Sequence, residues 1–157
     1  INAFNNEILC HCGKKGCLET ETSGSALYRI LLERIAGGEN SILSERVTET
    51  GNPLTLDEII TAVEKEDLLC IEIVEEIGQK LGRQIAGLIS IFNPELVIIG
   101  GTLSLTGDYI IQPIKTAVRK YSLNLVNKDA VIIPSKLKSK AGVVGACMLA
   151  RSRVFES

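Results

Sequence analysis

Apolar side chains recur at three- and four-residue intervals in several stretches of the chain, which is the spacing of one helical face. Thr55 and Glu58 have the spacing of a capping box, in which each side chain bonds the other's backbone N–H, so a helix is expected to begin there. Gly37-Gly38 and Asn93-Pro94 are expected to end two of the other helices. The pattern predicts helices over residues 23–35, 55–65, 69–92, 108–121 and 141–151.

Two short runs are continuously apolar instead of periodic. They are ELVIIGG, residues 95–101, and AVIIP, residues 130–134. Such runs are typical of strands covered on both faces in a parallel sheet. Residues 1–9 are expected to be extended, and the polar stretch 39–53 is expected to be a loop. The order helix, strand, helix, strand, helix predicts an α/β layered domain.

Two of the predicted helices carry further information about packing. The second half of the helix over 69–92 is apolar on most of its circumference, which predicts burial on more than one side. Near the C-terminus, Gly142, Gly145 and Ala146 are small enough to allow close approach to a neighbouring element. Close packing is therefore expected at both helices.

Length, composition and charge narrow the class of protein. The chain has 157 residues, 45% of them hydrophobic, and a formal net charge of −2. No apolar run is long enough to span a membrane, and no basic stripe would hold a nucleic-acid backbone. Cys70 and Cys147, two of five cysteines, lie in apolar helical patterns where thiols behave as small hydrophobic groups. One cytoplasmic domain that binds neither DNA nor membrane by itself is expected.

The stretch CHCGKKGC, residues 10–17, places three cysteines close together. Cys10, Cys12 and Cys17 suit a tetrahedral zinc ion, because the intervening glycines let the loop turn tightly. A disulfide and a nucleophilic cysteine are the alternatives, but the chain shows no secretory signal and only one histidine, His11. His11 is expected to point away from the centre that its neighbours share. We therefore expect a structural zinc site.

These residues resemble the ROK family, a group of bacterial repressors and sugar kinases on the actin-like, ribonuclease-H-like ATPase fold. CHCGKKGCLE matches the family pattern C-x-C-G-x-x-G-C-x-E. TSGSAL, IFNPELVIIGG and SKAGVVGACMLA follow in the family's order. The resemblance implies that residues 1–157 are the C-terminal lobe, with a strand remnant and zinc loop over 1–22, an α/β core over 23–157 and a helical insertion near 38–67.

The resemblance also implies roles for particular residues. The fourth zinc ligand would be a histidine ten residues before Cys10, immediately before Ile1. Glu19 would contact the sugar, although a carboxylate at this position also favours the start of a helix. Gly100 and Gly101 would lie near a nucleotide or, alternatively, serve only as a tight connection.

The resemblance leaves two functions open. Thr102 stands where many ROK kinases have a third glycine, which together with the polar stretch 38–67 favours the sugar-binding and oligomerising part of a repressor. The alternative is half of a kinase that uses Mg-ATP on a hexose or N-acetylhexosamine, and a module without either function is a third. The expected partners are a sugar or sugar phosphate and further copies of the chain, with DNA bound only through an upstream domain. Without a catalytic aspartate and a first phosphate loop, the chain alone is expected to be inactive.

Overall fold

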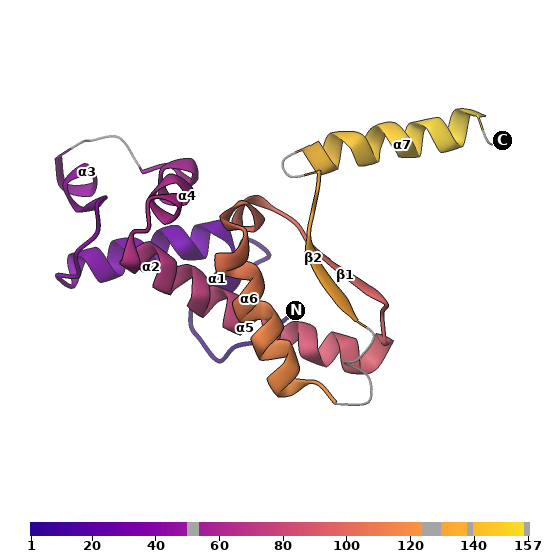
Figure 1. Cartoon of the computed structure of the whole chain (residues 1–157), viewed down its shortest axis with the longest axis horizontal. Coiled ribbons are helices and arrows are strands. Elements are labelled where there is room, and N and C mark those ends of the chain that lie inside the picture. The colour runs from indigo at the N-terminus through magenta and orange to yellow at the C-terminus, as the bar shows by residue number, and fades with distance from the viewer. Residues whose placement is uncertain (50–53, 124–129, 138–139, 156–157) are drawn as a thin grey trace.

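A computed structural model describes residues 1–49, 54–123, 130–137 and 140–155 (Figure 1). Short helices precede a long one, and two strands and two further helices follow. In chain order the elements are α1 (Glu19–Thr22), α2 (Gly24–Ala36), α3 (Ser44–Glu49), α4 (Leu56–Glu64), α5 (Leu68–Phe92), β1 (Leu96–Ile99), the 3₁₀ helix η1 (Thr102–Thr106), α6 (Asp108–Tyr121), β2 (Val131–Pro134) and α7 (Ala141–Phe155).

The main core lies between α5 and the helices packed on it, and we call α2, α4, α5 and α6 the helical body. Two glycines of α5 allow α6 to cross it at close range. A Cβ on Gly82 would lie 2.6 Å from the Ile114 carbonyl oxygen, and one on Gly78 would lie 2.9 Å from Pro113 Cβ. The crossing therefore depends on the absence of these two side chains, a contact that the hydrophobic pattern did not predict.

Side-chain hydrogen bonds cap the N-termini of α4 and α5. Thr55 N–H donates to Glu58 Oε2 at 2.7 Å, and Glu58 N–H donates to Thr55 Oγ1 at 3.3 Å, so the predicted capping box is confirmed. At the start of α5, Asp67 accepts hydrogen bonds from the backbone N–H of Cys70 at 2.9 Å and of Ile42 at 2.8 Å. Asp67 thus also fixes the chain that precedes α3.

The two strands form a parallel pair, in which Leu96 lies beside Val131 and Ile98 beside Ile133. One face of the pair is buried, since Ile132 is 5% exposed. The other face is open, since Ile98 is 57% exposed. The prediction of strands covered on both faces is therefore wrong for the described chain, in which helices cover one face only.

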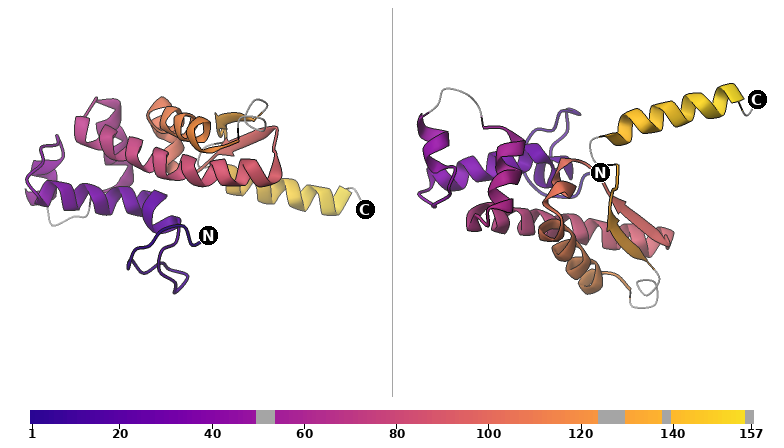
Figure 2. Two further views of the ribbon diagram at one scale, coloured as in Figure 1. Left: turned by 90° about the horizontal axis from the view of Figure 1, so that it is seen from below. Right: turned by 45° about the horizontal axis from the view of Figure 1, so that its top comes forward.

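α7 projects away from the rest of the chain, as two directions of view show (Figures 1 and 2). None of its residues is buried, and nothing lies within 4 Å of a Cβ built on Gly142 or Gly145. The expected close approach is thus not made within the described residues. Cys147 is exposed although it lies in an apolar helical pattern, whereas Cys70 is buried, and burial raises the pKa of its thiol to about 12.

The long helix α5 is buried on one side only along its second half. Ile85 and Ile89 belong to the core, but Leu88, Ile91 and Phe92 are exposed. The predicted burial on more than one side is therefore not found, because no second layer of described residues packs there.

The predicted loop over residues 39–53 contains α3, which the hydrophobic pattern did not predict. Leu43 is buried and Val47, four residues later, packs against the core, so a short apolar face is present. Residues 50–53 lie outside the described part. The five predicted helices and two predicted strands occur within a few residues of their expected bounds, whereas the short helices α1 and η1 were not predicted. The mixed α/β class is confirmed.

Candidate functional site

The cysteine loop, residues 10–17, is closed by backbone hydrogen bonds. Gly13 N–H donates to the Cys10 carbonyl at 2.9 Å, and the Gly16 carbonyl accepts from Phe4 N–H at 3.0 Å. Gly13 and Gly16 have φ of +81° and +71°, and a Cβ on Gly16 would lie 2.1 Å from the Phe4 carbonyl oxygen. The prediction that glycines let this loop turn tightly is confirmed.

The three thiols of the loop converge. The Sγ atoms of Cys10, Cys12 and Cys17 all lie within 4.8 Å of one another, and those of Cys12 and Cys17 are 3.4 Å apart. Sulfurs around a tetrahedral zinc ion are about 3.8 Å apart, given a Zn–S distance of about 2.3 Å. The donor set therefore fits zinc, with three of four ligand positions supplied by this loop.

Hydrogen bonding separates the acidities of two of these thiols. A backbone hydrogen bond from Lys14 lowers the pKa of Cys12, and hydrogen bonds with Cys17 and Cys10 add to this effect. The hydrogen bond with Cys12 raises the pKa of Cys17 to about 11, and burial adds to it. Cys12 is thus the first of the pair to become a thiolate, the form that binds metal.

His11 is exposed and does not belong to the cluster of metal-ligating side chains found in the described chain. It lies instead on the wall of a pocket of about 170 Å³ between the cysteine loop and the first two helices. Glu19, the first residue of α1, lies on the same wall together with Ser25 and Arg29. The wall thus combines these polar residues with the apolar side chains of Ile8, Leu9 and Ala26, and such a mixed lining is typical of small-molecule sites.

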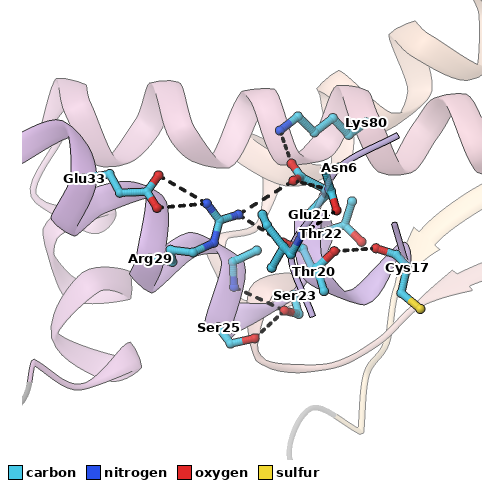
Figure 3. A network of polar contacts seen from close by, with 12 residues as sticks. Asn6, Cys17, Thr20, Glu21, Thr22, Ser23, Ser25, Arg29, Glu33 and Lys80 are labelled. Atoms are coloured by element: carbon cyan, nitrogen blue, oxygen red, sulfur yellow. Dashed lines mark hydrogen bonds and ion pairs between the residues drawn. The ribbon is translucent and has the colours of Figure 1, made fainter. Parts of the chain in front are cut away.

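A partly buried polar network, which no sequence pattern indicated, lies beside this pocket (Figure 3). At its centre is Glu21, whose side chain is 14% exposed. One carboxylate oxygen accepts from Asn6 Nδ2 at 2.7 Å, and the other accepts from Lys80 Nζ at 2.6 Å. Arg29 lies 3.8 Å from the same carboxylate and donates to the Thr20 carbonyl at 3.1 Å. Because Glu21 and Lys80 are 59 residues apart, no local pattern could have paired them.

The Gly-Gly turn lies on a different part of the chain, between β1 and η1. Gly101 has a φ of +85°, which an L side chain rarely adopts, and it precedes the 3₁₀ helix. Among the described residues, nothing lies within 4 Å of a Cβ built on Gly101, and only Ser135 Cβ lies near Gly100, at 4.0 Å. The turn therefore needs glycine for its backbone angle and leaves open space above it, which is compatible with either expected role.

The two lysines of the cysteine loop are exposed, and Lys15 pairs with Glu7 on the surface. Neither contacts the pocket. Their geometry agrees with solvated loop charges.

The ROK family model matches residues 1–153. This chain belongs to the ROK family. The match covers the cysteine loop, the pocket and the Gly-Gly turn alike, so the three regions are parts of one family fold.

Both sugar kinases and transcriptional repressors are similar to this chain in sequence. A glucokinase of Halalkalibacterium halodurans is 34% identical over 144 residues, covering 92% of this chain and 43% of that protein. The DNA-binding transcriptional repressor Mlc of Escherichia coli is 28% identical over 140 residues, covering 89% of this chain and 33% of that protein. Sequence similarity therefore places the chain among ROK proteins without separating repressor from kinase.

Solved structures of a ROK regulator and of a ROK kinase are both similar to this chain. A ROK family transcriptional regulator, described as a homologue of the Escherichia coli Mlc protein, superposes with a TM-score of 0.81 at 30% identity, covering 97% of this chain and 37% of that one. A ROK glucokinase from Streptomyces griseus, in complex with glucose and AMPPNP, gives 0.80 at 28% identity, covering 96% and 51%. The chain thus spans between a third and about half of the length of these ROK proteins.

No helix in the described ranges has both the length and the apolar character needed to cross a bilayer.

Proposed function

We propose that residues 1–157 form the C-terminal lobe of a ROK transcriptional repressor and carry its sugar-binding and oligomerisation surfaces. The observation that carries this proposal is the position of Glu19, which shares one small pocket with His11 beside three converged thiols. The ligand would be a sugar or a sugar phosphate. DNA would be bound by another part of the protein.

In this proposal Cys10, Cys12 and Cys17 hold a structural zinc ion, with a fourth ligand outside this cluster. The ion would supply cross-linking of the loop and no reaction chemistry. The loop's own hydrogen bonds fix the backbone that leads directly into α1. Glu19 would then accept hydrogen bonds from sugar hydroxyls, because an ionised carboxylate is a strong acceptor for such donors.

Two features support the repressor over the kinase. Thr102 follows the Gly-Gly turn where many ROK kinases have a third glycine, and it begins η1. The stretch 38–67, where the resemblance leads us to expect a helical insertion typical of regulators, holds α3 and α4. Open apolar surface on β1, β2 and α7 supplies area for contacts with other parts of the protein or with a second copy.

The alternative is the C-terminal half of a ROK sugar kinase, and the 34% identity to a glucokinase favours it. Gly100 and Gly101 would then lie beside the nucleotide, in the open space that their turn provides. Mg-ATP would be required only under this alternative. The two functions differ in whether the intact protein converts ATP to ADP when sugar is present.

Metal analysis tests whether the cysteine loop binds zinc. The intact protein should contain about one zinc ion per chain, and Cys12→Ser should lower that content because a ligand is lost. Cys70→Ser is the matched control, since Cys70 lies in the core away from the loop. A folded protein that holds no metal above background would contradict the zinc site.

Calorimetric titration with glucose, xylose and N-acetylglucosamine tests the second step. Glu19→Gln should weaken binding of the sugar that the wild type takes, with zinc content unchanged. Glu75→Gln, an exposed carboxylate on α5, is the control and should bind as the wild type does. Sugar affinity that Glu19→Gln leaves intact would return Glu19 to a helix-starting role.

An ADP-release assay on the intact protein separates the two functions. The repressor proposal predicts no sugar-dependent ADP formation from Mg-ATP. Sustained turnover would establish the kinase alternative instead.

A further inference from the structure

The direction in which Glu19 points depends on α1, and α1 is too short to hold its own position. It has four residues, and its N-cap, Leu18, offers no side-chain hydrogen bond. Isolated helices of this length are not stable, so tertiary contacts must fix its orientation. The contacts of its remaining side chains therefore decide where the Glu19 carboxylate lies.

Glu19 and Glu21 leave α1 in opposite directions. Two residues along a helix correspond to a rotation of about 200°, and residues so spaced do not face each other. Glu19 is exposed beside the pocket, whereas the Glu21 side chain is 14% exposed and faces the protein. A rotation of α1 that freed Glu21 would therefore turn Glu19 away from the pocket.

Glu21 is held by three segments of the chain at once. Asn6, from the extended segment before the cysteine loop, and Lys80, from α5, each donate to one of its oxygens. Arg29, from α2, completes the set and also binds the carbonyl of Thr20 on α1 (Figure 3). A largely buried carboxylate with one donor on each oxygen resists displacement, because an unpaired buried charge is costly.

We infer that Glu21 is a positioning residue for the sugar-contacting carboxylate, and that Lys80 on α5 is its essential partner. The inference rests on the proposed role of Glu19. It assigns to Lys80, which does not line the pocket, an effect on ligand affinity. It also couples the orientation of the pocket wall to α5, the central helix of the body.

The test is calorimetric titration of the intact protein with glucose, xylose and N-acetylglucosamine, using the sugar that the wild type binds. Glu21→Gln and Lys80→Met should weaken binding by roughly tenfold or more, because a displaced contact loses its productive geometry. Lys80→Arg should bind nearly as the wild type does, since it keeps the positive charge. Zinc content should stay unchanged in all three variants.

Glu72→Gln is the matched control. Glu72 joins α5 to α2 through Arg34 at 2.8 Å and does not touch α1, so its loss should leave sugar affinity unchanged. Wild-type affinity in either Glu21→Gln or Lys80→Met, or an equal loss in Glu72→Gln, would overturn the positioning role. Loss of zinc together with sugar would overturn it too, because Glu21 would then serve the cysteine loop.

Failure of the proposed function gives a different result. If Glu19→Gln itself binds sugar normally, the sugar-binding role is wrong and the positioning role falls with it. If Glu19→Gln loses affinity while Lys80→Met does not, only the positioning role is wrong. Should Glu21→Gln fail to fold, the comparison of Lys80→Met with Lys80→Arg decides the matter alone.

Discussion

In the helical body, α5 and α6 cross so closely that Gly82 has no room for a methyl group, whereas α7 carries Gly145 with nothing within 4 Å. The helices α5 and α7 are both rich in small and apolar residues, but only α5 is packed against other described elements. The difference shows that an apolar pattern indicates which helix surfaces can pack against a neighbour. Whether a neighbour is present depends on other parts of the fold.

The largest expected effect on stability comes from comparing the buried face of the β1–β2 pair with its open face. Ile132→Ala should destabilise the chain by about 3 kcal/mol, because it empties a site in the packed core. Ile98→Ala, on the opposite face, should cost no more than about 0.5 kcal/mol, because its side chain already faces solvent. Chemical denaturation measures both, and equal losses would mean that the open face is covered in solution.

The crossing of α5 and α6 gives the second contrast. Gly82→Ala should lower the free energy of unfolding by about 2 kcal/mol, because the new methyl group would lie 2.8 Å from Ala117 Cβ and closer still to backbone. Gly87→Ala, on the same helix in open space, should raise it by up to about 1 kcal/mol through helix propensity. If α7 is unpacked, Gly145→Ala should have the same effect as Gly87→Ala. Thermal melts would then show a change in melting temperature of the same sign for these two variants.

Asp67 gives the third effect, which depends on pH. Burial acts to raise the pKa of Asp67, but hydrogen bonds from the backbone of Ile42 and Cys70 outweigh it and hold the pKa below its ordinary value. A lowered carboxyl pKa contributes stability above about pH 4, and that stability is lost as pH falls through the folded-state pKa. Asp67→Ala should therefore cost about 1–2 kcal/mol at neutral pH, and the difference from the wild type should shrink in acid.

Unfolding curves at several pH values check this prediction. A gap between wild type and Asp67→Ala that stayed constant down to the acid limit would show that the ionised carboxylate is not the source of the stability.

The smallest expected effect on folding concerns the exposed residues of α7. Leu149→Ser should change the free energy of unfolding by less than about 0.5 kcal/mol, since α7 contributes nothing to the core. It should nevertheless reduce self-association, because it interrupts exposed apolar surface. Sedimentation at several concentrations measures this, and a large loss of stability would show that α7 packs against the body.

Local signals in the sequence were sufficient wherever the structure is decided by neighbouring residues. The capping box of Thr55 and Glu58, the end of α5 at Asn93 and the positive φ of Gly13 and Gly16 were all predictable. Each depends on steric or hydrogen-bonding preferences that act within a few residues. The convergence of three thiols followed for the same reason, because eight residues contain the whole loop.

Contacts between distant segments were out of reach of such signals. The short helix α3 was missed because its stability depends on Leu43 and Val47 meeting the core, and on Asp67 binding the backbone of Ile42. Cys147 is exposed although it lies in an apolar helical pattern, because such a pattern does not show whether a packing partner is present.

The sequence by itself determined the order of the longer helices and the two strands, the cysteine loop and the ROK pattern, because these depend on short-range geometry and on residue type. Only the tertiary structure decided that Lys80 reaches Glu21, that α6 crosses α5 over Gly78 and Gly82, and that one face of the β1–β2 pair stays open. Those outcomes depend on which surfaces meet once the chain has folded, and a linear pattern of polar and apolar residues does not contain that information.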